Sequence, residues 1–447
     1  MSRIERAVPA AALPVYHRVR PRSSTLDAGR FPAHVILGGN VDRNADSGSD
    51  RAVKTVLDEL ATRLDAVRET NIGWPAASDV DFAALTKFFK RHLLNNLGDP
   101  FAVGAYPQHT KDLEAEVVDV LADLMRAPVD DRWGYVTAGA GEGNLYALHL
   151  ARSLHSKGVV YYSESSHYSV DKAVDLLAMP SIRVRADASG RMDMDDLAGV
   201  VASNRDRPAI VVANIGTTMT EAVDDVREIG EVLDSLAVRR RFVHADAALS
   251  GIPLSLLDPQ TRPGFDFADG TDSMIVSGHK FLGTPIPCGV VLVKASHRVH
   301  LTRTGGFIGS PDTTIGCSRS GHAALMIWYV LRRYGVDGLR ARADQAREVA
   351  RYAHRRLVEL GWDAWLNQHA FTVVLATPPA PVTQRWTLAS TNGRSHIICM
   401  PGVTRAQIDA FVGDLQAAMP TPTLVSVPSP PPRRTPELRR ATPAHVA

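Results

Sequence analysis

Hydrophobic residues follow two different periodicities along this chain. In residues 51–68 and again in 113–125 they recur every three or four positions, which predicts two amphipathic helices. From about residue 133, short runs that are apolar throughout alternate with helical stretches. Such runs are typical of strands that are covered on both faces of a sheet. The predicted strands are 133–137, 159–163, 182–185, 209–214, 242–245, 273–276 and 290–293.

Strands separated by helices favour a mostly parallel sheet built from right-handed crossovers, an α/β architecture. The pattern changes once more after residue 321. Helices are predicted at 322–334, 339–360 and 405–419, and strands at 371–376 and 396–400, which together form a small α/β unit. We therefore expect one large domain on the main sheet, followed by a small C-terminal domain.

The chain divides into five predicted segments by composition. Residues 1–50 form a variable, partly disordered extension, for which packing of one part on a partner subunit is the alternative. Residues 421–447 form a disordered tail rich in Pro and Arg, because this composition cannot bury a core; a basic docking tail is the alternative. Between them we expect a helical segment (51–130), the large domain (131–321) and the small domain (322–420).

The overall composition excludes several classes of protein. Of 447 residues, 45% are hydrophobic and 22% are charged, as in ordinary soluble proteins. Fifty Lys and Arg against 48 Asp and Glu give a net charge of +2, too balanced for nucleic acid or a membrane as the main partner. The three widely spaced cysteines form neither a disulfide framework nor a metal-binding pair, so we expect a cytoplasmic protein with no metal site.

Candidate chemistry lies where predicted strands end. Lys280, in Ser277-Gly278-His279-Lys280, directly follows the strand 273–276, and Asp246 follows the strand 242–245. Taken alone, the lysine reads as an ordinary surface residue, whereas a carboxylate after an apolar strand is costly to bury without a cationic partner. A lysine and an aspartate at neighbouring strand ends, however, are what pyridoxal phosphate (PLP) requires. The amine binds the cofactor as a Schiff base, and the carboxylate keeps the pyridine nitrogen protonated.

Three further segments follow the same rule. Thr137–Asn144 is a small-residue loop between a strand and a helix, suited to holding a phosphate; it matches neither the Rossmann pattern, since Asn144 stands at the third glycine, nor the Walker A pattern. His167 follows the strand 159–163 and offers a flat ring for stacking. Thr217 and Thr218 follow the strand 209–214. The alternatives for these three segments are, in the same order, a plain turn, a surface or core histidine, and a helix cap.

The chain resembles the group II PLP-dependent amino-acid decarboxylases, in the branch that holds bacterial histidine decarboxylase and plant serine decarboxylase. The resemblance spans roughly residues 55–418. It is carried by NIGWP (71–75), NNLGDPF (95–101), WGYVTAGAGEGN (133–144), YYSESSHYSV (161–170), NIGTT (214–218), HADAALSG (244–251), SGHKFLGTPIPCGV (277–290) and CSRSGH (317–322). It implies the fold-type I, aminotransferase-like architecture, PLP as cofactor, and a homodimer or higher homo-oligomer with its active sites at the interface.

The resemblance also implies a role for each matching residue. Lys280 would form the Schiff base, Asp246 would pair with the pyridine nitrogen, and His167 would stack on the ring and contact the substrate. Other positions would hold the cofactor or the substrate. The expected cofactor residues are Ala140, Gly141, Ser277 and His279 at the phosphate, Ala248 under the ring and Thr217 near its substituents; the expected substrate residues, besides His167, are Tyr106 and His109.

Three positions depart from the family pattern. Ala140-Gly141 replaces Gly-Thr in the phosphate loop, Phe307 replaces a Tyr, and Ala370 replaces a Ser. The expected reaction is α-decarboxylation of a histidine-like or serine-like L-amino acid to the amine and CO2. The alternatives are an aldehyde synthase, another fold-type I PLP enzyme such as an aminotransferase or a side-chain lyase, and a cofactor-free regulatory protein on the same fold.

Overall fold

The computed structural model describes residues 46–301, 303–304 and 306–419. The chain divides into two compact units, Met1–Arg63 and Leu64–Ala447. Helix α1 (Asp46–Thr70) runs across this boundary and begins five residues before the helix that the sequence predicts. Of the predicted extension 1–50, residues 1–45 lie outside the described residues, as does the predicted tail 421–447. The five predicted segment boundaries stay predictions.

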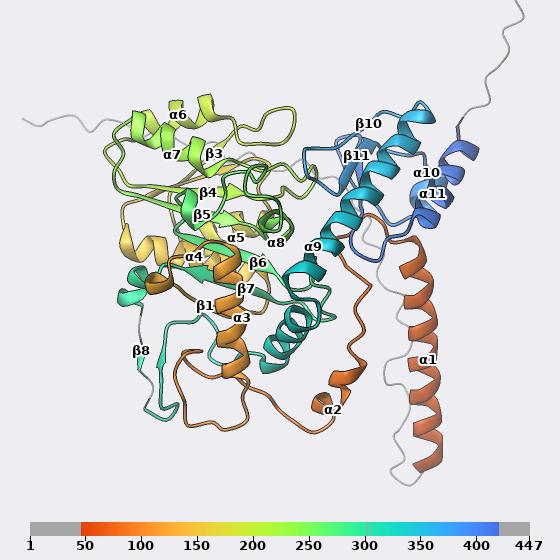
Figure 1. Ribbon diagram of the computed structural model, residues 1–447, viewed down its shortest axis with the longest axis horizontal. Coiled ribbons are helices and arrows are strands. Elements are labelled where there is room, and N and C mark those ends of the chain that lie inside the picture. Colours follow the sequence, from red (N-terminus) through yellow and green to blue (C-terminus); the bar gives the residue numbers. More distant parts are fainter. Residues whose placement is uncertain (1–45, 302, 305, 420–447) are drawn as a thin grey trace, which may run out of the picture. The chain divides into compact units, whose positions relative to one another are not determined.

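The main element of the second unit is a seven-stranded sheet, ordered β1-β7-β6-β5-β4-β2-β3 (Figure 1). Strand β7 is antiparallel to both of its neighbours, and the neighbouring pairs from β6 to β3 are parallel. The seven strands agree with the predicted runs to within one residue at each end. They are β1 (Trp133–Thr137), β2 (Val159–Ser163), β3 (Ser181–Val184), β4 (Ala209–Asn214), β5 (Arg241–Asp246), β6 (Ser273–Ser277) and β7 (Gly289–Val293).

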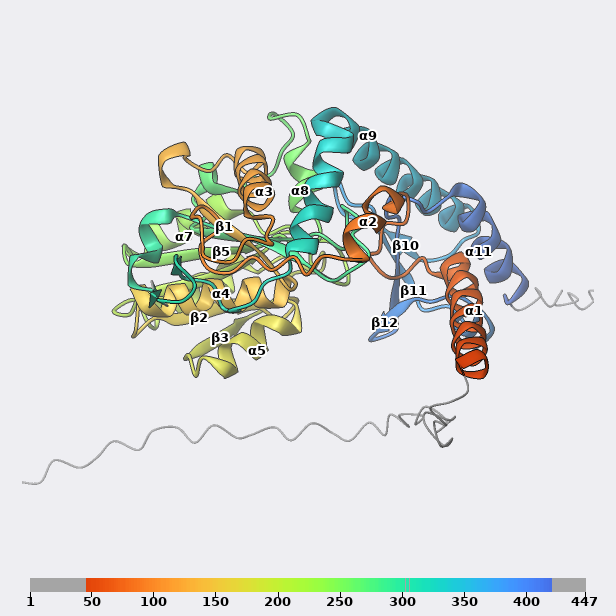
Figure 2. The same ribbon diagram turned by 90° about the horizontal axis from the view of Figure 1, so that it is seen from below.

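Alternate residues of these strands enter two different cores, one on each face of the sheet. Helices α4 and α5 cover one face, while α3 and α8 lie on the other (Figure 2). Gly143 lets α4 approach the sheet, because a Cβ there would lie 2.3 Å from the Ile275 side chain of β6. The helices of this part are α3 (Lys111–Leu124), α4 (Ala140–Leu154), α5 (Tyr168–Leu176), α6 (Met194–Ala202), α7 (Val226–Ser235) and α8 (Gly251–Ser255).

A second, four-stranded antiparallel sheet has the order β10-β11-β13-β12. Its strands are β10 (Ala364–Trp365), β11 (Thr372–Ala376), β12 (Ala389–Thr391) and β13 (Arg394–Ile398). The periodicity missed β10 and β12, which are too short to show one. The accompanying helices are α9 (Gly321–Glu359), α10 (Ala380–Arg385) and α11 (Arg405–Ala417).

Helix α9 replaces the two helices predicted at 322–334 and 339–360. It is interrupted at Gly335, whose φ of 58° and ψ of −175° are not helical, so the predicted break is real but short. The remaining short elements are α2 (Thr86–Phe89), β8 (Arg303–Thr304), β9 (Pro311–Asp312) and 3-10 turns at Ala83–Leu85, Val129–Asp131, Phe267–Asp269 and Ala295–His300. Within the described ranges, no helix combines the length and the apolar character that crossing a membrane requires.

Candidate active site

The carboxyl ends of β1, β2, β4, β5 and β6 lead into one cavity of about 500 Å³. Parallel strands deliver the residues that follow them to the same sheet edge, which is why segments far apart in the sequence meet here. Nine of the eleven residues selected from the sequence line this cavity. They are Ala140, Gly141, His167, Thr217, Asp246, Ala248, Ser277, His279 and Lys280.

The other two predicted residues, Tyr106 and His109, are outside this lining. The hydroxyl of Tyr106 donates to the carbonyl of Leu93 at 3.1 Å, and Nδ1 of His109 accepts from the amide of Lys111 at 3.3 Å. Both side chains are half-buried. Within a single chain, therefore, they do not join the other nine.

Lys280 and Asp246 are the amine and the carboxyl group of the cavity lining. Burial lowers the pKa of Lys280, and the carboxylates of Asp246 and Glu221 partly offset this effect. Asp246 is 7% exposed, and its Oδ1 accepts from the amide of Ala248 at 3.3 Å. Burial thus shifts the pKa of the amine toward its neutral, nucleophilic form, and Asp246 lines the same cavity.

His167 caps the N-terminus of α5. Its Nδ1 accepts from the amide of Ser169 and lies 2.8 Å from the hydroxyl of that serine. Burial lowers the pKa of His167, with the Asp246 carboxylate acting in the opposite direction. The ring is therefore held in one orientation and is disposed to be neutral.

One end of the cavity has the chemistry of a phosphate site. Gly139 has a φ of 150°, a conformation that favours glycine, and it starts α4 so that the helix N-terminus faces the cavity lining. Among the described residues, nothing accepts from the amides of Ala140 and Gly141, and the buried hydroxyl of Ser277 has no partner. Unsatisfied donors at a helix N-terminus fit an anionic group such as the PLP phosphate.

His279 also lines this end, and its Nδ1 is 2.9 Å from the carbonyl of Cys288. Burial lowers the pKa of His279. Two tautomers of the neutral ring are compatible with these contacts. In the first, Nδ1 donates to the carbonyl and Nε2 is an acceptor. In the second, Nδ1 accepts from the amide of Cys288 at 3.2 Å and Nε2 is a donor. The second arrangement is the one that suits an anion.

Several residues near this cavity were missed by the sequence reasoning. Asn144 and His244 lie behind Asp246, and His396, from the second sheet, lines the cavity itself. Glu221 is 2% exposed and has a φ of 53°, unusual for a residue with a side chain. Asn144 and His244 could have been found from the sequence, because each is a polar residue within a motif at a strand end. No sequence feature marked Glu221 or His396.

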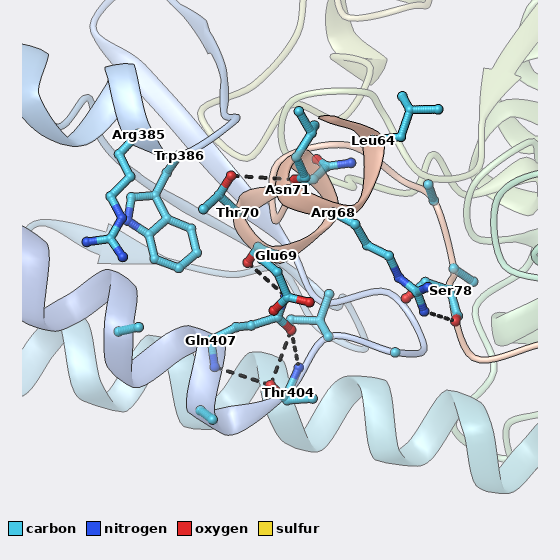
Figure 3. A pocket seen from close by; sticks show the side chains of 17 residues that line it. Leu64, Arg68, Glu69, Thr70, Asn71, Ser78, Arg385, Trp386, Thr404 and Gln407 are labelled. Atoms are coloured by element: carbon cyan, nitrogen blue, oxygen red, sulfur yellow. Dashed lines mark hydrogen bonds between the residues drawn. The ribbon is translucent and has the colours of Figure 1, made fainter. Parts of the chain in front are cut away.

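A second cavity, of about 620 Å³, is lined by the end of α1, by residues 76–78 and by the start of α11 (Figure 3). Its polar groups largely satisfy one another. Arg68 donates to the carbonyl of Ser78 at 2.8 Å, and Gln407 donates to the carbonyl of Glu69 at 3.1 Å. None of the eleven residues selected from the sequence lines it, although all eleven are described, so its larger volume does not make it the reactive site.

The fold and the smaller cavity define a class of enzyme. A lysine, an aspartate and a histidine at the carboxyl edge of a seven-stranded α/β sheet, beside unsatisfied amides at a helix N-terminus, characterise fold-type I PLP enzymes. A profile of the pyridoxal-dependent decarboxylase conserved domain matches residues 94–374. The chain belongs to this family: it is a PLP-dependent carboxy-lyase that acts on an amino acid.

Named relatives agree with the family. A histidine decarboxylase of Mesorhizobium japonicum is 43% identical over 80% of this chain and 95% of its own length. One of Vibrio campbellii is 37% identical over 77% of this chain and 89% of its own length. A solved L-methionine decarboxylase of Streptomyces sp. 590 superposes with a TM-score of 0.77 at 28% identity, covering 86% of this chain and 96% of that one.

Proposed function

We propose that this enzyme decarboxylates L-histidine, giving histamine and CO2. The observation that carries the proposal is the composition of the cavity beyond the lysine and the aspartate. Besides the nine predicted residues, the lining includes Gly73–Ala76, Leu249, Ala389, His396 and Ile398. Apart from Lys280 and Asp246, the described lining contains no acidic residue, lysine or arginine. Such a lining suits an uncharged side chain and disfavours glutamate, aspartate or lysine. The names of the relatives point to histidine among the neutral candidates.

The residue roles are part of the same proposal. Lys280 would hold the cofactor through its amine, and Asp246 would keep the ring nitrogen protonated. The amides of Ala140 and Gly141, with Ser277 and His279, would bind the phosphate, because all four residues line the cavity and the two amides and the Ser277 hydroxyl have no partner among the described residues. When bound, PLP supplies an electron-accepting ring for the bond that breaks to the substrate carboxylate.

The remaining residues would orient the reactants and exclude water. His167 would cover one face of the ring, and Ala248 would pack against the other. Thr217 would contact the ring substituents; its hydroxyl lies 2.8 Å from that of Thr220 and 3.0 Å from the Ala222 amide, so it is held in place. Electrostatic stabilisation by Asp246 in a site closed to water would provide a large share of the rate enhancement.

A direct assay tests the substrate. The purified full chain, loaded with PLP, is supplied separately with each of the twenty amino acids, and CO2 and amine are measured. We expect histamine from L-histidine as the fastest reaction and none from Lys280→Ala. Faster release of ethanolamine from L-serine would contradict the histidine assignment. Oxygen uptake with an aldehyde product would favour the aldehyde synthase, for which Phe307 is the motivating departure.

We also propose that the enzyme is a homodimer whose active sites receive residues from both chains. Two observations support this. Tyr106 and His109 lie outside the cavity of their own chain, and an apolar stripe on α1 is exposed. An exposed apolar stripe of this size is typical of an interaction surface. Its residues, between 37% and 62% exposed, are Val53, Val56, Leu57, Leu60, Leu64 and Val67.

Mixing two inactive variants tests the shared site. Lys280→Ala removes the amine, and His109→Ala removes a residue proposed to act in the other chain's cavity. After the two variants are co-expressed, mixed dimers contain one cavity that lacks neither residue, so activity returns. The control is a mixture of Lys280→Ala with Asp246→Ala. These two residues line the same chain's cavity, so each cavity of a mixed dimer lacks one of them and no activity returns. If the His109→Ala mixture is no more active than the control, although differently tagged chains show that mixed dimers formed, His109 lies outside the shared site.

A cytoplasmic location is proposed from the cysteines. Cys288 and Cys399 are buried free thiols, and Cys317 is an exposed free thiol. Thiols that remain unpaired are typical of a reducing compartment. Cell fractionation with antibody detection would test this, and recovery in an oxidising compartment would contradict it.

A further inference from the structure

The carboxamide of Asn144 lies at the centre of a buried hydrogen-bond network behind the cavity. Its Nδ2 is 2.9 Å from Oδ2 of Asp246 and 2.9 Å from the hydroxyl of Ser169. Its Oδ1 is 2.8 Å from Nε2 of His244. Asn144 and His244 are fully buried, and water does not compete for these bonds. Asn144 is not among the residues that line the cavity.

The direction of each bond follows from what each group can donate. An ionised carboxylate only accepts, so Nδ2 of Asn144 must donate to Asp246. Oδ1 of Asn144 must then accept, and Nε2 of His244 must carry the hydrogen. Nδ1 of His244 is left to accept from the hydroxyl of Ser273, 2.8 Å away. Burial lowers the pKa of His244 to about 4, which agrees with a neutral ring.

A branch of the same network reaches His167. The hydroxyl of Ser169 accepts from Asn144 and therefore has its own hydrogen free to donate to Nδ1 of His167, at 2.8 Å. The amide of Ser169 points to the same nitrogen at 3.3 Å. With Nδ1 as an acceptor, a neutral His167 carries its hydrogen on Nε2. One carboxamide thus contacts the carboxylate directly and the imidazole through a single hydroxyl.

We propose that Asn144 is a positioning residue that holds Asp246 as an oriented carboxylate against the cofactor nitrogen and, through Ser169, fixes the tautomer of His167. This inference rests on the proposed roles of Asp246 and His167. A charge-assisted hydrogen bond in a buried site is strong, and losing the donor leaves the carboxylate without its partner. The relay from Ser273 through His244 keeps the carboxamide from rotating, because a flipped amide would face Asp246 with an oxygen.

The test measures how tightly the full-length enzyme holds PLP, by equilibrium dialysis at pH 6 and pH 8. Asn144→Asp keeps the side-chain volume but replaces the donor with a second carboxyl. We expect its PLP dissociation constant to rise about 10- to 100-fold at pH 8, as loss of one charge-assisted bond implies. At pH 6 the ratio to wild type should be several-fold smaller, because two adjacent carboxyls retain a proton that restores a donor.

Two further variants separate this role from a merely structural one. Asn144→Leu has no donor at any pH, so its ratio to wild type should be similar at pH 6 and pH 8. Tyr146→Phe, at a fully buried position of the same helix, should bind PLP as wild type does. The other titratable groups near the network are His167, His244, Lys172 and Lys280; they are present in every variant, so their contributions cancel in these ratios.

The possible outcomes distinguish the positioning role of Asn144 from the proposed role of Asp246, on which it rests. If Asp246→Asn weakens PLP binding while both Asn144 variants bind as wild type, the positioning role is wrong. An Asn144→Asp ratio that is the same at both pH values also overturns it, since only proton sharing predicts the difference. If Asp246→Asn itself leaves the affinity for PLP unchanged, the proposed role of Asp246 is wrong, and the positioning role of Asn144 is wrong with it. Asn144→Asp remains decisive even if Asn144→Leu does not fold, because its volume matches asparagine.

Discussion

Replacing Glu221 by glutamine should stabilise the protein above neutral pH. This carboxyl is 2% exposed and joins two parts of the fold. Its Oε1 accepts from the hydroxyl of Ser250 at 2.9 Å, and its Oε2 accepts from the amide of Phe371, just before β11, at 3.1 Å. A glutamine can keep both contacts: its oxygen accepts from Phe371, and its NH2 donates to Ser250, whose hydroxyl rotates to accept.

The magnitude follows from the pKa of this group. Burial raises the pKa of Glu221 from its ordinary 4.5 to about 7, although its hydrogen bonds and Arg347 act in the opposite direction. The folded chain therefore binds more protons than the unfolded chain between about pH 4.5 and pH 7, and the free energy of unfolding falls as the pH rises through this window. A pKa difference of this size corresponds to about 3 kcal/mol, which the glutamine variant does not lose.

Urea unfolding of the wild type and of Glu221→Gln at pH 5 and pH 8 measures this effect. We expect the two proteins to differ by less than about 1 kcal/mol at pH 5, and the variant to be more stable by about 2–3 kcal/mol at pH 8. Arg347, Cys399 and Lys280 also interact with Glu221, and they are unchanged in both proteins. If the difference in stability between the two proteins does not grow with pH, the pKa of Glu221 is not raised by burial and the reasoning is refuted.

Three other changes have definite expected outcomes. Asp246→Asn should retain part of the PLP, seen in the visible absorbance, and lower kcat by at least about 100-fold, because an amide cannot hold the ring proton; near-normal turnover would contradict its role. Gly143→Leu should destabilise the fold by about 1–3 kcal/mol in urea, since a Cβ there meets a side chain of β6 at 2.3 Å; Gly199→Ala, which has open space in α6, is the control and should not destabilise. Glu114→Ala leaves the buried guanidinium of Arg319 unpaired and should cost about 3–5 kcal/mol, measured in the same way; a loss below 1 kcal/mol would show that the pair is not buried in solution.

Much of the fold and most of the candidate site follow from local sequence features. Mainly apolar runs predicted six of the seven strands of the main sheet, because residues covered on both faces are mainly hydrophobic. The seventh, the edge strand β3, contains Arg183 and is only partly buried. The residues that follow those strands then predicted Lys280, Asp246 and His167 as neighbours, since parallel strands present their ends at one edge. Nine of the eleven selected residues line one cavity for this reason.

The tertiary structure decided what no local pattern encodes. No sequence pattern marked Glu221; its buried carboxyl accepts from the amide of Phe371, just before β11 and 150 residues further along the chain. In the sequence, Asn144 stands only where the Rossmann pattern would have its third glycine. Its hydrogen bond with Asp246 joins residues that are 102 positions apart. Whether Tyr106 and His109 share the cavity likewise depends on packing at a distance, which hydrophobic periodicity does not specify. Spacing along a chain fixes which face of an element a residue occupies, whereas its partners are set by how the elements pack.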